Sequence, residues 1–226
     1  MTATVVVTGG TGGLGAAVTR AFLDGGWRVV VPWLFEEELE RVADHERLQL
    51  VKADLMEPAA AAEVVDAAGD DLRAVANLVG GFAIGGRVHE TPIDEFERLL
   101  RLNLRPTYLV SAAALPRLLG AGGGAIVCVS SRAAVRPFPG AAGYITAKAA
   151  VLAFVDALHE EYRRDGVRVN AILPSTIDTP ANREAMPDAD FDTWVRPEEI
   201  ARVVRELCSD HCAVISGGHI PVYGRA

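Results

Sequence analysis

Two residues able to exchange protons, Tyr144 and Lys148, are four positions apart in the segment PGAAGYITAKAAVLAFV (139–155). Four residues make about one helical turn, so a helix here would place the phenol and the ammonium on the same face. A cation about 4 Å from the phenol contributes roughly 4 kcal/mol at an effective dielectric near 20. That is about the free energy that brings a tyrosine pKa from about 10 to about 7. The spacing therefore suits an acid–base centre, although a half-buried Tyr beside a snorkelling Lys on an ordinary helix has the same pattern.

A glycine-rich turn, VVVTGGTGGLGAAV, follows the first apolar run and precedes the first helical segment. Gly9, Gly13 and Gly15 have the spacing G-x-x-x-G-x-G. Glycines permit a tight turn and let the backbone approach a ligand closely, and the helix beyond offers free N–H groups to a pyrophosphate. Between a strand and a helix this pattern predicts nucleotide binding, with a purely structural turn as the alternative.

The net charge of -8 argues against a nucleic-acid partner and against binding to an anionic membrane surface. No apolar run reaches the roughly 18 residues of a membrane span, and the opening MTATVVVTGG is expected to enter a strand and a turn without a leader. The three cysteines, Cys128, Cys208 and Cys212, form no disulfide framework, which favours a reducing cytoplasm. Cys208, His211 and Cys212 could together be imagined as metal ligands, but this set lacks a fourth partner at a usual spacing, so no metal site is expected.

Short runs rich in Val and Ile alternate with longer segments rich in Ala, Leu and Glu. Strands are expected at 4–9, 28–33, 48–53, 74–79, 125–130, 167–173 and 213–223, and helices at about 13–24, 36–44, 57–68, 94–119, 143–165 and 197–208. Such alternation indicates a parallel sheet covered on both faces. With right-handed crossovers it predicts a single Rossmann-type, doubly wound α/β domain over residues 1–226, with a seven-stranded, mainly parallel sheet.

Two features depart from this regular pattern. The segment 174–194 is rich in Pro, Asp and Thr, and a loop of that length in a compact domain is usually functional or mobile. Pro221 in the last expected strand cannot donate a ladder hydrogen bond, which favours an edge position for that strand.

Taken in order, these motifs resemble the short-chain dehydrogenase/reductase (SDR) family over essentially the whole chain. The glycine turn begins with Thr8, and the Tyr-x-x-x-Lys pair is preceded by Asp54-Leu55, NLVGG (77–81), Asn103 in LLRLNL, and VCVSS (127–131). NAILPSTIDT (170–179) matches the family's Pro-Gly loop, with Ser175 in place of the glycine. The resemblance implies an NAD(P)-dependent oxidoreductase that transfers hydride between a nicotinamide and a small carbonyl or alcohol substrate.

The same resemblance implies catalytic roles for four residues. Tyr144 would exchange a proton with the substrate oxygen, and Lys148 would also hold the nicotinamide ribose. Ser131 would stabilise charge on that oxygen, and Asn103 would anchor a water that relays protons. Strand alternation sends the hydroxyls of Ser130 and Ser131 to opposite sides, so only one can serve. The separation from Tyr144 that is usual in the family favours Ser131.

The resemblance also implies a cofactor-binding set drawn from the glycine turn and from the ends of the later strands. Its members are Gly9, Thr11, Gly13, Leu14, Gly15, Trp33, Asp54, Leu55, Asn77, Gly80, Lys148, Pro174, Ile177 and Thr179. An acid at the end of the second strand prefers the ribose 2′-hydroxyl of NAD, and basic residues prefer the 2′-phosphate of NADP. Here Trp33 stands at that position, where it covers the adenine or packs in the core. The nearby acids at 36–38 oppose a phosphate only weakly, and the sequence therefore leans toward NAD.

Two alternatives to a general carbonyl or alcohol oxidoreductase remain at this stage. Residues 173–194 and GGFAIGG (80–86) look like the corresponding loops of dihydropteridine reductases, a group that typically lacks the active-site serine present here. Arg183, Met186, Phe191 and Trp194 are the candidate substrate contacts of the loop 174–194, with packing against the domain as the alternative. A catalytically silent NAD(P)-binding redox sensor would not need the proton-relay residues. The family commonly forms homodimers and homotetramers through the helices expected at 94–119 and 143–165 and through the last strand.

Overall fold

The central strands are short runs rich in Val, Ile and Ala that are buried on both faces of one sheet, whereas the two edge strands are more exposed. The computed structural model describes residues 2–225, and all residues of β1 (Thr4–Thr8) are buried in it. The other strands are β2 (Arg28–Trp33), β3 (Leu48–Lys52), β4 (Leu72–Asn77), β5 (Gly124–Val129), β6 (Val167–Pro174) and β7 (His219–Val222). They pair in parallel in the order β3-β2-β1-β4-β5-β6-β7. The predicted doubly wound α/β fold is therefore confirmed.

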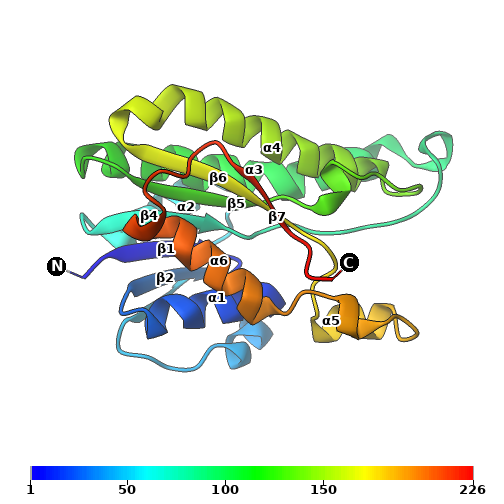
Figure 1. Cartoon of the computed structure of the whole chain (residues 1–226), viewed down its shortest axis with the longest axis horizontal. Helices are drawn as coiled ribbons and strands as arrows, with labels where there is room; N and C mark the ends of the chain where they lie inside the picture. The colour runs from blue at the N-terminus through cyan, green and yellow to red at the C-terminus, as the bar shows by residue number, and fades with distance from the viewer. Residues whose placement is uncertain (1, 226) are drawn as a thin grey trace.

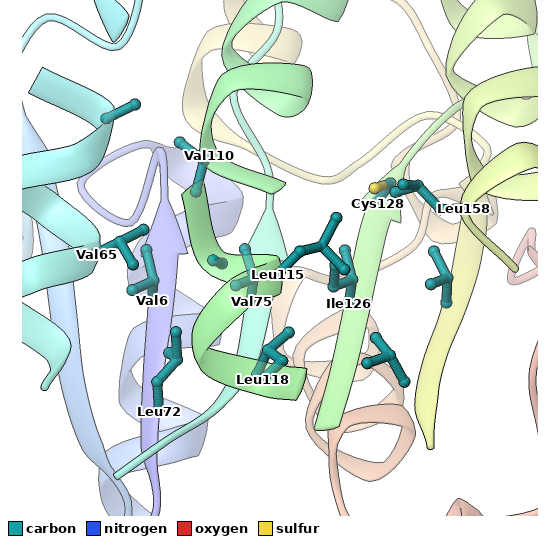
Figure 2. Close-up of a cluster of buried hydrophobic side chains, with 14 of the residues drawn as sticks. Val6, Val65, Leu72, Val75, Val110, Leu115, Leu118, Ile126, Cys128 and Leu158 are labelled. Carbon is teal, nitrogen blue, oxygen red and sulfur yellow. The ribbon is translucent and has the colours of Figure 1, made fainter. Parts of the chain in front are cut away.

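Helices cover both faces of this sheet (Figure 1). On one face lie α2 (Pro58–Ala68), α3 (Ile93–Gly120) and α4 (Ala142–Tyr162), and on the other lie α1 (Gly13–Asp24) and α6 (Pro197–Cys208). Figure 2 shows the core on the first face, where Val75 of β4 and Ile126 of β5 meet Leu115 and Leu118 of α3. A second core, around Phe22, fills the space between the sheet and the other two helices.

The segment 36–44 was expected to be a helix, and the structure corrects this. Only a 3-10 turn, η1 (Glu36–Arg41), is present, and none of its residues is buried. A short helix without a face to pack against is marginal in water, since tertiary packing supplies most of helix stability. The turn instead lies at the end of β2, next to the glycine turn.

The carboxyl-terminal strand is also shorter than the expected 213–223. Only His219–Val222 pair with β6, because Gly217 adopts a left-handed conformation with φ of 72° and the residues before it form turns. β7 is an edge strand, as Pro221 predicted. The fourth and fifth expected helices are close to their predicted bounds, and residues 163–165 form a 3-10 turn that ends at Gly166.

The segment 174–194 has more regular structure than its composition indicated. It contains a short helix, α5 (Pro180–Ala185), and a 3-10 turn, η5 (Phe191–Thr193), and Ile177 forms a β-bridge with Val195. Pro180 occupies the first turn of α5, where its missing N–H has no intrahelical partner to lose. Figure 1 shows α5 and the loop between β4 and α3 projecting from the same end of the sheet. Within the described residues, no helix is both long and apolar enough to cross a bilayer.

Candidate active site

The glycine turn connects the carboxyl end of β1 to α1 at the point where the strand order reverses between β1 and β4. Gly9 has φ of 66°, a conformation that favours glycine. A Cβ atom at Gly15 would collide with the carbonyl oxygen of Gly9. Thr8 Oγ1 accepts a hydrogen bond from the backbone N–H of Leu78 at 3.0 Å, which ties the ends of the two strands together. Ligands of open α/β sheets bind in the crevice at such a reversal point.

A cleft of about 410 Å³ opens beside this turn. Its walls come from the glycine turn, the end of β2, the segment after β3 and the segment after β4. Of the residues expected to bind the cofactor, Gly9, Thr11, Gly13, Leu14, Gly15, Trp33, Asp54, Leu55 and Gly80 line it. The space that side chains would occupy at the glycines is left to a ligand, and α1 points its amino end at the turn. This cradle fits the pyrophosphate of a dinucleotide.

The loop after β6 meets the glycine turn from the other side. A Cβ atom at Gly13 would lie 3.1 Å from Cγ2 of Thr179, so this threonine stands directly against the turn. Thr179 Oγ1 also accepts a hydrogen bond from Asn182 N–H at 3.3 Å, which caps α5. Pro174 ends β6, and the Ile177 carbonyl accepts from the Asn182 side chain at 2.8 Å. Of the three residues expected here, the structure thus brings Thr179 against the turn, and neither it nor Pro174 nor Ile177 lines the cleft.

Asn77 lies at the end of β4 with its side chain in the core. Its Nδ2 donates to Ser111 Oγ at 3.0 Å and is 3.8 Å from Cys128 Sγ. The next residues, Leu78, Val79 and Gly80, line the cleft in its place. Asn77 was expected to contact the cofactor, but the alternation of a strand turns its side chain away from the cleft.

Tyr144 and Lys148 are on α4, one turn apart, as their spacing predicted. Lys148 Nζ is 5.9 Å from the centroid of the Tyr144 ring. Burial raises the pKa of Tyr144, and a hydrogen bond with Ser131 opposes this rise only in part. In the protein without a ligand, the pKa of Tyr144 is therefore raised above its ordinary value rather than lowered toward 7. Burial removes water from the phenolate and so disfavours the charged form.

Lys148 is a buried cation at the centre of the site. The residue is only 5% exposed, and its ammonium donates a hydrogen bond to the Val129 carbonyl at 3.0 Å. Burial lowers its pKa from 10.5 to about 8. A Cβ atom at Gly80 would lie 2.9 Å from Lys148 Nζ, so the floor of the cleft directly adjoins the ammonium. An ammonium has three donors, and one backbone acceptor leaves capacity for ligand hydroxyls.

The two serines after β5 have different partners. Ser130 is buried, and its hydroxyl donates to the Lys148 carbonyl at 2.7 Å, which holds α4 against the strand. Ser131 is half-buried and accepts from Ala133 N–H at 3.1 Å, and its hydroxyl lies close enough to Tyr144 to oppose the rise in the pKa of the phenol. The structure thus places Ser131, and not Ser130, beside the phenol.

Asn103 is buried in the middle of α3 with each polar atom of its side chain paired. Nδ2 donates to the carbonyls of Gly81 at 3.0 Å and Leu99 at 2.9 Å, and Oδ1 accepts from Gly81 N–H at 3.1 Å. A Cβ atom at Gly80 would lie 2.5 Å from Oδ1, so the glycine, the asparagine and Lys148 are in close contact. The side chain positions the loop after β4, an arrangement that sequence similarity did not anticipate.

Two residues near the cleft were not singled out by the sequence. Glu38 of η1 turns back toward the glycine turn, where its Oε2 accepts from Thr11 Oγ1 at 2.6 Å. Phe82 packs edge to face against Tyr144, with ring centroids 5.0 Å apart, and is 59% exposed. In the sequence, only the position of Phe82 within GGFAIGG, shortly after the end of a strand, could have indicated that this residue lies at the site. Of the loop candidates, Arg183 forms a bidentate ion pair with Asp178, while Phe191 packs edge to face on Trp194.

Comparison with known proteins agrees with this geometry. The family model described as short chain dehydrogenase matches residues 3–190. The chain is 30% identical to 2-(R)-hydroxypropyl-CoM dehydrogenase of Xanthobacter autotrophicus, over 90% of this chain and 84% of that protein.

Two solved structures have the same fold. A 3-ketoacyl-(acyl-carrier-protein) reductase from Brucella melitensis, complexed with NADH, has a TM-score of 0.88 at 26% identity, over 99% of this chain and 98% of that one. ElxO with NADP bound has a TM-score of 0.91 over 99% of this chain and 98% of that one. At 21% sequence identity, this similarity shows only that the two proteins share a fold.

Proposed function

This chain belongs to the short-chain dehydrogenase/reductase family and is an NAD(P)-dependent oxidoreductase, and from that premise we propose that Tyr144 is its general acid and base. The observation that carries the proposal is the position of the phenol, beside the Ser131 hydroxyl and one turn from a buried ammonium. When bound, the dinucleotide supplies or accepts the hydride.

The side chains around Tyr144 divide the remaining work. Tyr144 holds a proton at its phenolic oxygen and exchanges it with the substrate oxygen. The Ser131 hydroxyl donates a hydrogen bond to that oxygen and stabilises charge on it. Lys148 supplies a positive charge next to the phenolate and donors for ribose hydroxyls. Because burial raises the pKa of Tyr144, the phenol is protonated at neutral pH, which suits donation of a proton to a carbonyl.

The substrate that we propose is a small, uncharged carbonyl compound or the corresponding alcohol. The exposed ring of Phe82 lies against Tyr144. A cavity of about 380 Å³ lies next to the amino end of α4, and its wall includes Ala83, Val88, Ile93 and Phe96. Apolar walls around a few polar groups are typical of a site for a small organic molecule. Residues 174–194 are the proposed substrate loop, because Thr179 places this segment against the glycine turn.

Three finer features belong to the same proposal. We expect NAD to be preferred, since none of the described residues that line the cleft is Lys or Arg.

We expect a homodimer or homotetramer through α3, α4 and β7, because Tyr108 is 54% exposed on α3 and its ring packs against Phe154 of α4. Light scattering should then give a mass of two or four chains. A cytoplasmic location is in keeping with three free cysteines.

The test is the variant Tyr144→Phe, assayed with a panel of small carbonyl compounds and both reduced dinucleotides. Loss of the proton donor should lower kcat by about 10²–10⁴-fold, while the dissociation constant of the dinucleotide changes little. Tyr108→Phe is the matched control, because it removes a hydroxyl from an exposed residue of α3 and should leave kcat unchanged. Turnover of Tyr144→Phe at the wild-type rate would exclude the proposed role. Including a quinonoid dihydropteridine in the panel tests the alternative substrate.

A further inference from the structure

We propose that Glu38, which follows β2 by five residues, selects the dinucleotide whose adenosine ribose carries a free 2′-hydroxyl. The inference rests on the proposed function, because it assumes that a nicotinamide dinucleotide binds in the cleft beside the glycine turn. It adds to that function the residue that discriminates between NAD and NADP. An acid at the end of the second strand usually does so in dinucleotide-binding folds, and this chain has no acid there.

The end of β2 itself offers no carboxylate to the ribose. Trp33 lines the cleft at this point, and Lys52 Nζ lies 5.2 Å from the centroid of its ring. Leu34 and Phe35 also line the cleft and are largely exposed. Their side chains are apolar, so a polar contact to the ribose from this side has to come from further along the chain.

Glu38 supplies that group because it is held at the wall of the cleft. Thr11 Oγ1 donates to Glu38 Oε2 at 2.6 Å, a contact that spans 27 positions of the sequence and joins η1 to the glycine turn. Arg41 Nη1 lies 3.3 Å from Glu38 Oε1 and also approaches the Thr11 carbonyl at 3.4 Å. Thr11 and Glu38 both line the cleft. The neighbouring Glu37 is exposed and does not line it, so one acid of the run is singled out.

The charges around this point favour a hydroxyl over a phosphate. A carboxylate accepts a hydrogen bond from a ribose hydroxyl, whereas it repels a 2′-phosphate. The cations nearby are Arg41 and Lys52. Arg41 is paired with Glu38, Lys52 lies over the Trp33 ring, and neither lines the cleft. While it is paired with Glu38, the guanidinium is occupied and offers no free site to a phosphate.

The experiment compares dissociation constants of NADH and NADPH, measured by nicotinamide fluorescence without substrate. We expect the wild-type protein to bind NADH at least about tenfold more tightly than NADPH, an effect of one well-placed charge. Glu38→Gln keeps the shape of the side chain and removes the charge. It should reduce the ratio by about tenfold or more, mainly by tightening NADPH. Glu37→Gln removes the same charge from an exposed neighbour and should leave the ratio within about twofold.

A second variant tests the role of the arginine. In Glu38→Gln the guanidinium of Arg41 is released from its carboxylate, so the gain in NADPH affinity should depend on it. Adding Arg41→Gln to Glu38→Gln should therefore remove most of that gain. Thermal unfolding of each variant shows whether the fold is retained.

The outcomes separate this inference from the proposed function. If the wild-type protein binds NADPH as tightly as NADH, or if Glu38→Gln and Glu37→Gln change the ratio equally, Glu38 is not the selecting residue, although the oxidoreductase assignment stands. If neither dinucleotide binds to the wild-type protein, the proposed site itself is wrong. A ratio that changes only with Glu38 supports the inference.

Discussion

The two ends of the dinucleotide cleft hold their positive charges in different ways. At the catalytic end, Lys148 is 5% exposed, and its ammonium donates to a backbone carbonyl. At the adenosine end, the side chain of Arg41 is 50% exposed and pairs with the carboxylate of Glu38, which is 30% exposed. Lys148 is therefore held in place by the protein interior that surrounds it. Arg41 is held by a carboxylate that is itself accessible to water.

Under the two proposals above, this difference separates the residue expected to set reactivity from those expected to set selectivity. Burial lowers the pKa of Lys148 because desolvation disfavours the charged form. The same desolvation lowers the free energy of unfolding while the ammonium is charged. The Glu38–Arg41 pair is screened by solvent and contributes little to stability. We therefore expect substitutions at the catalytic end to change rate and stability strongly, and those at the adenosine end to change mainly the choice of ligand.

Among the substitutions that leave Tyr144 and Lys148 in place, the largest effect on turnover is expected for Gly80→Ala. The added Cβ would lie 2.5 Å from Asn103 Oδ1 and 2.9 Å from Lys148 Nζ. Asn103 is held by three hydrogen bonds, whereas Lys148 meets the added methyl with the flexible end of its side chain, so we expect the ammonium to be displaced most. Misplacement of a catalytic group by about 1 Å lowers turnover by about 10²-fold, and steady-state kinetics should show a loss of at least this size.

Gly85→Ala is the matched control, because a Cβ atom there meets no atom within 4 Å. Its kcat should stay within about twofold of the wild type. Equal turnover of both variants would contradict a catalytic role for the Lys148 ammonium, which packs closely against Gly80.

For stability rather than turnover, a gain is expected for Lys148→Met. A pKa lowered from 10.5 to about 8 corresponds to roughly 3 kcal/mol that the buried ammonium costs at pH 7. Loss of the donor to the Val129 carbonyl costs about 1 kcal/mol. The variant should therefore be more stable by about 2 kcal/mol in urea unfolding at pH 7 without dinucleotide, although it is inactive.

The pH dependence gives the sign of this effect. Between pH 8 and pH 10.5 the folded protein has released the Lys148 proton and the unfolded chain still binds it. Stability of the wild type from this group then rises with pH, and its difference from Lys148→Met should close toward pH 10.5. A variant that is less stable than the wild type at pH 7 would show that the ammonium stabilises the fold.

The smallest effect is expected for Arg41→Gln. The pair with Glu38 is half-exposed, and such pairs contribute about 0–1 kcal/mol. Urea unfolding in the same buffer should show a change below about 0.5 kcal/mol. A loss of about 2 kcal/mol or more would mean that η1 depends on this pair, and the contrast between the two ends of the cleft would disappear.

The sequence was sufficient for the architecture because the relevant patterns are local. A strand is present in each expected segment, and the central ones are apolar runs because burial on both faces requires such a run wherever it occurs. The one-turn spacing of Tyr144 and Lys148 likewise follows from helix geometry. Where no tertiary contact supported a local pattern, as in 36–44, the expected helix was absent. The catalytic and cofactor roles of the individual residues stay predictions.

The sequence by itself determined the order of strands and helices, the glycine turn and the face that carries the two proton-exchanging residues. Only the tertiary structure decided the ionisation of Tyr144, because its pKa depends on how much water the surrounding loops exclude. The tertiary structure also decided the position of Glu38, because the sequence pattern alone does not distinguish this acid from its neighbour Glu37. Its contact with Thr11 joins residues 27 positions apart, and the distance between such residues is fixed by the packing of the whole sheet rather than by any local propensity.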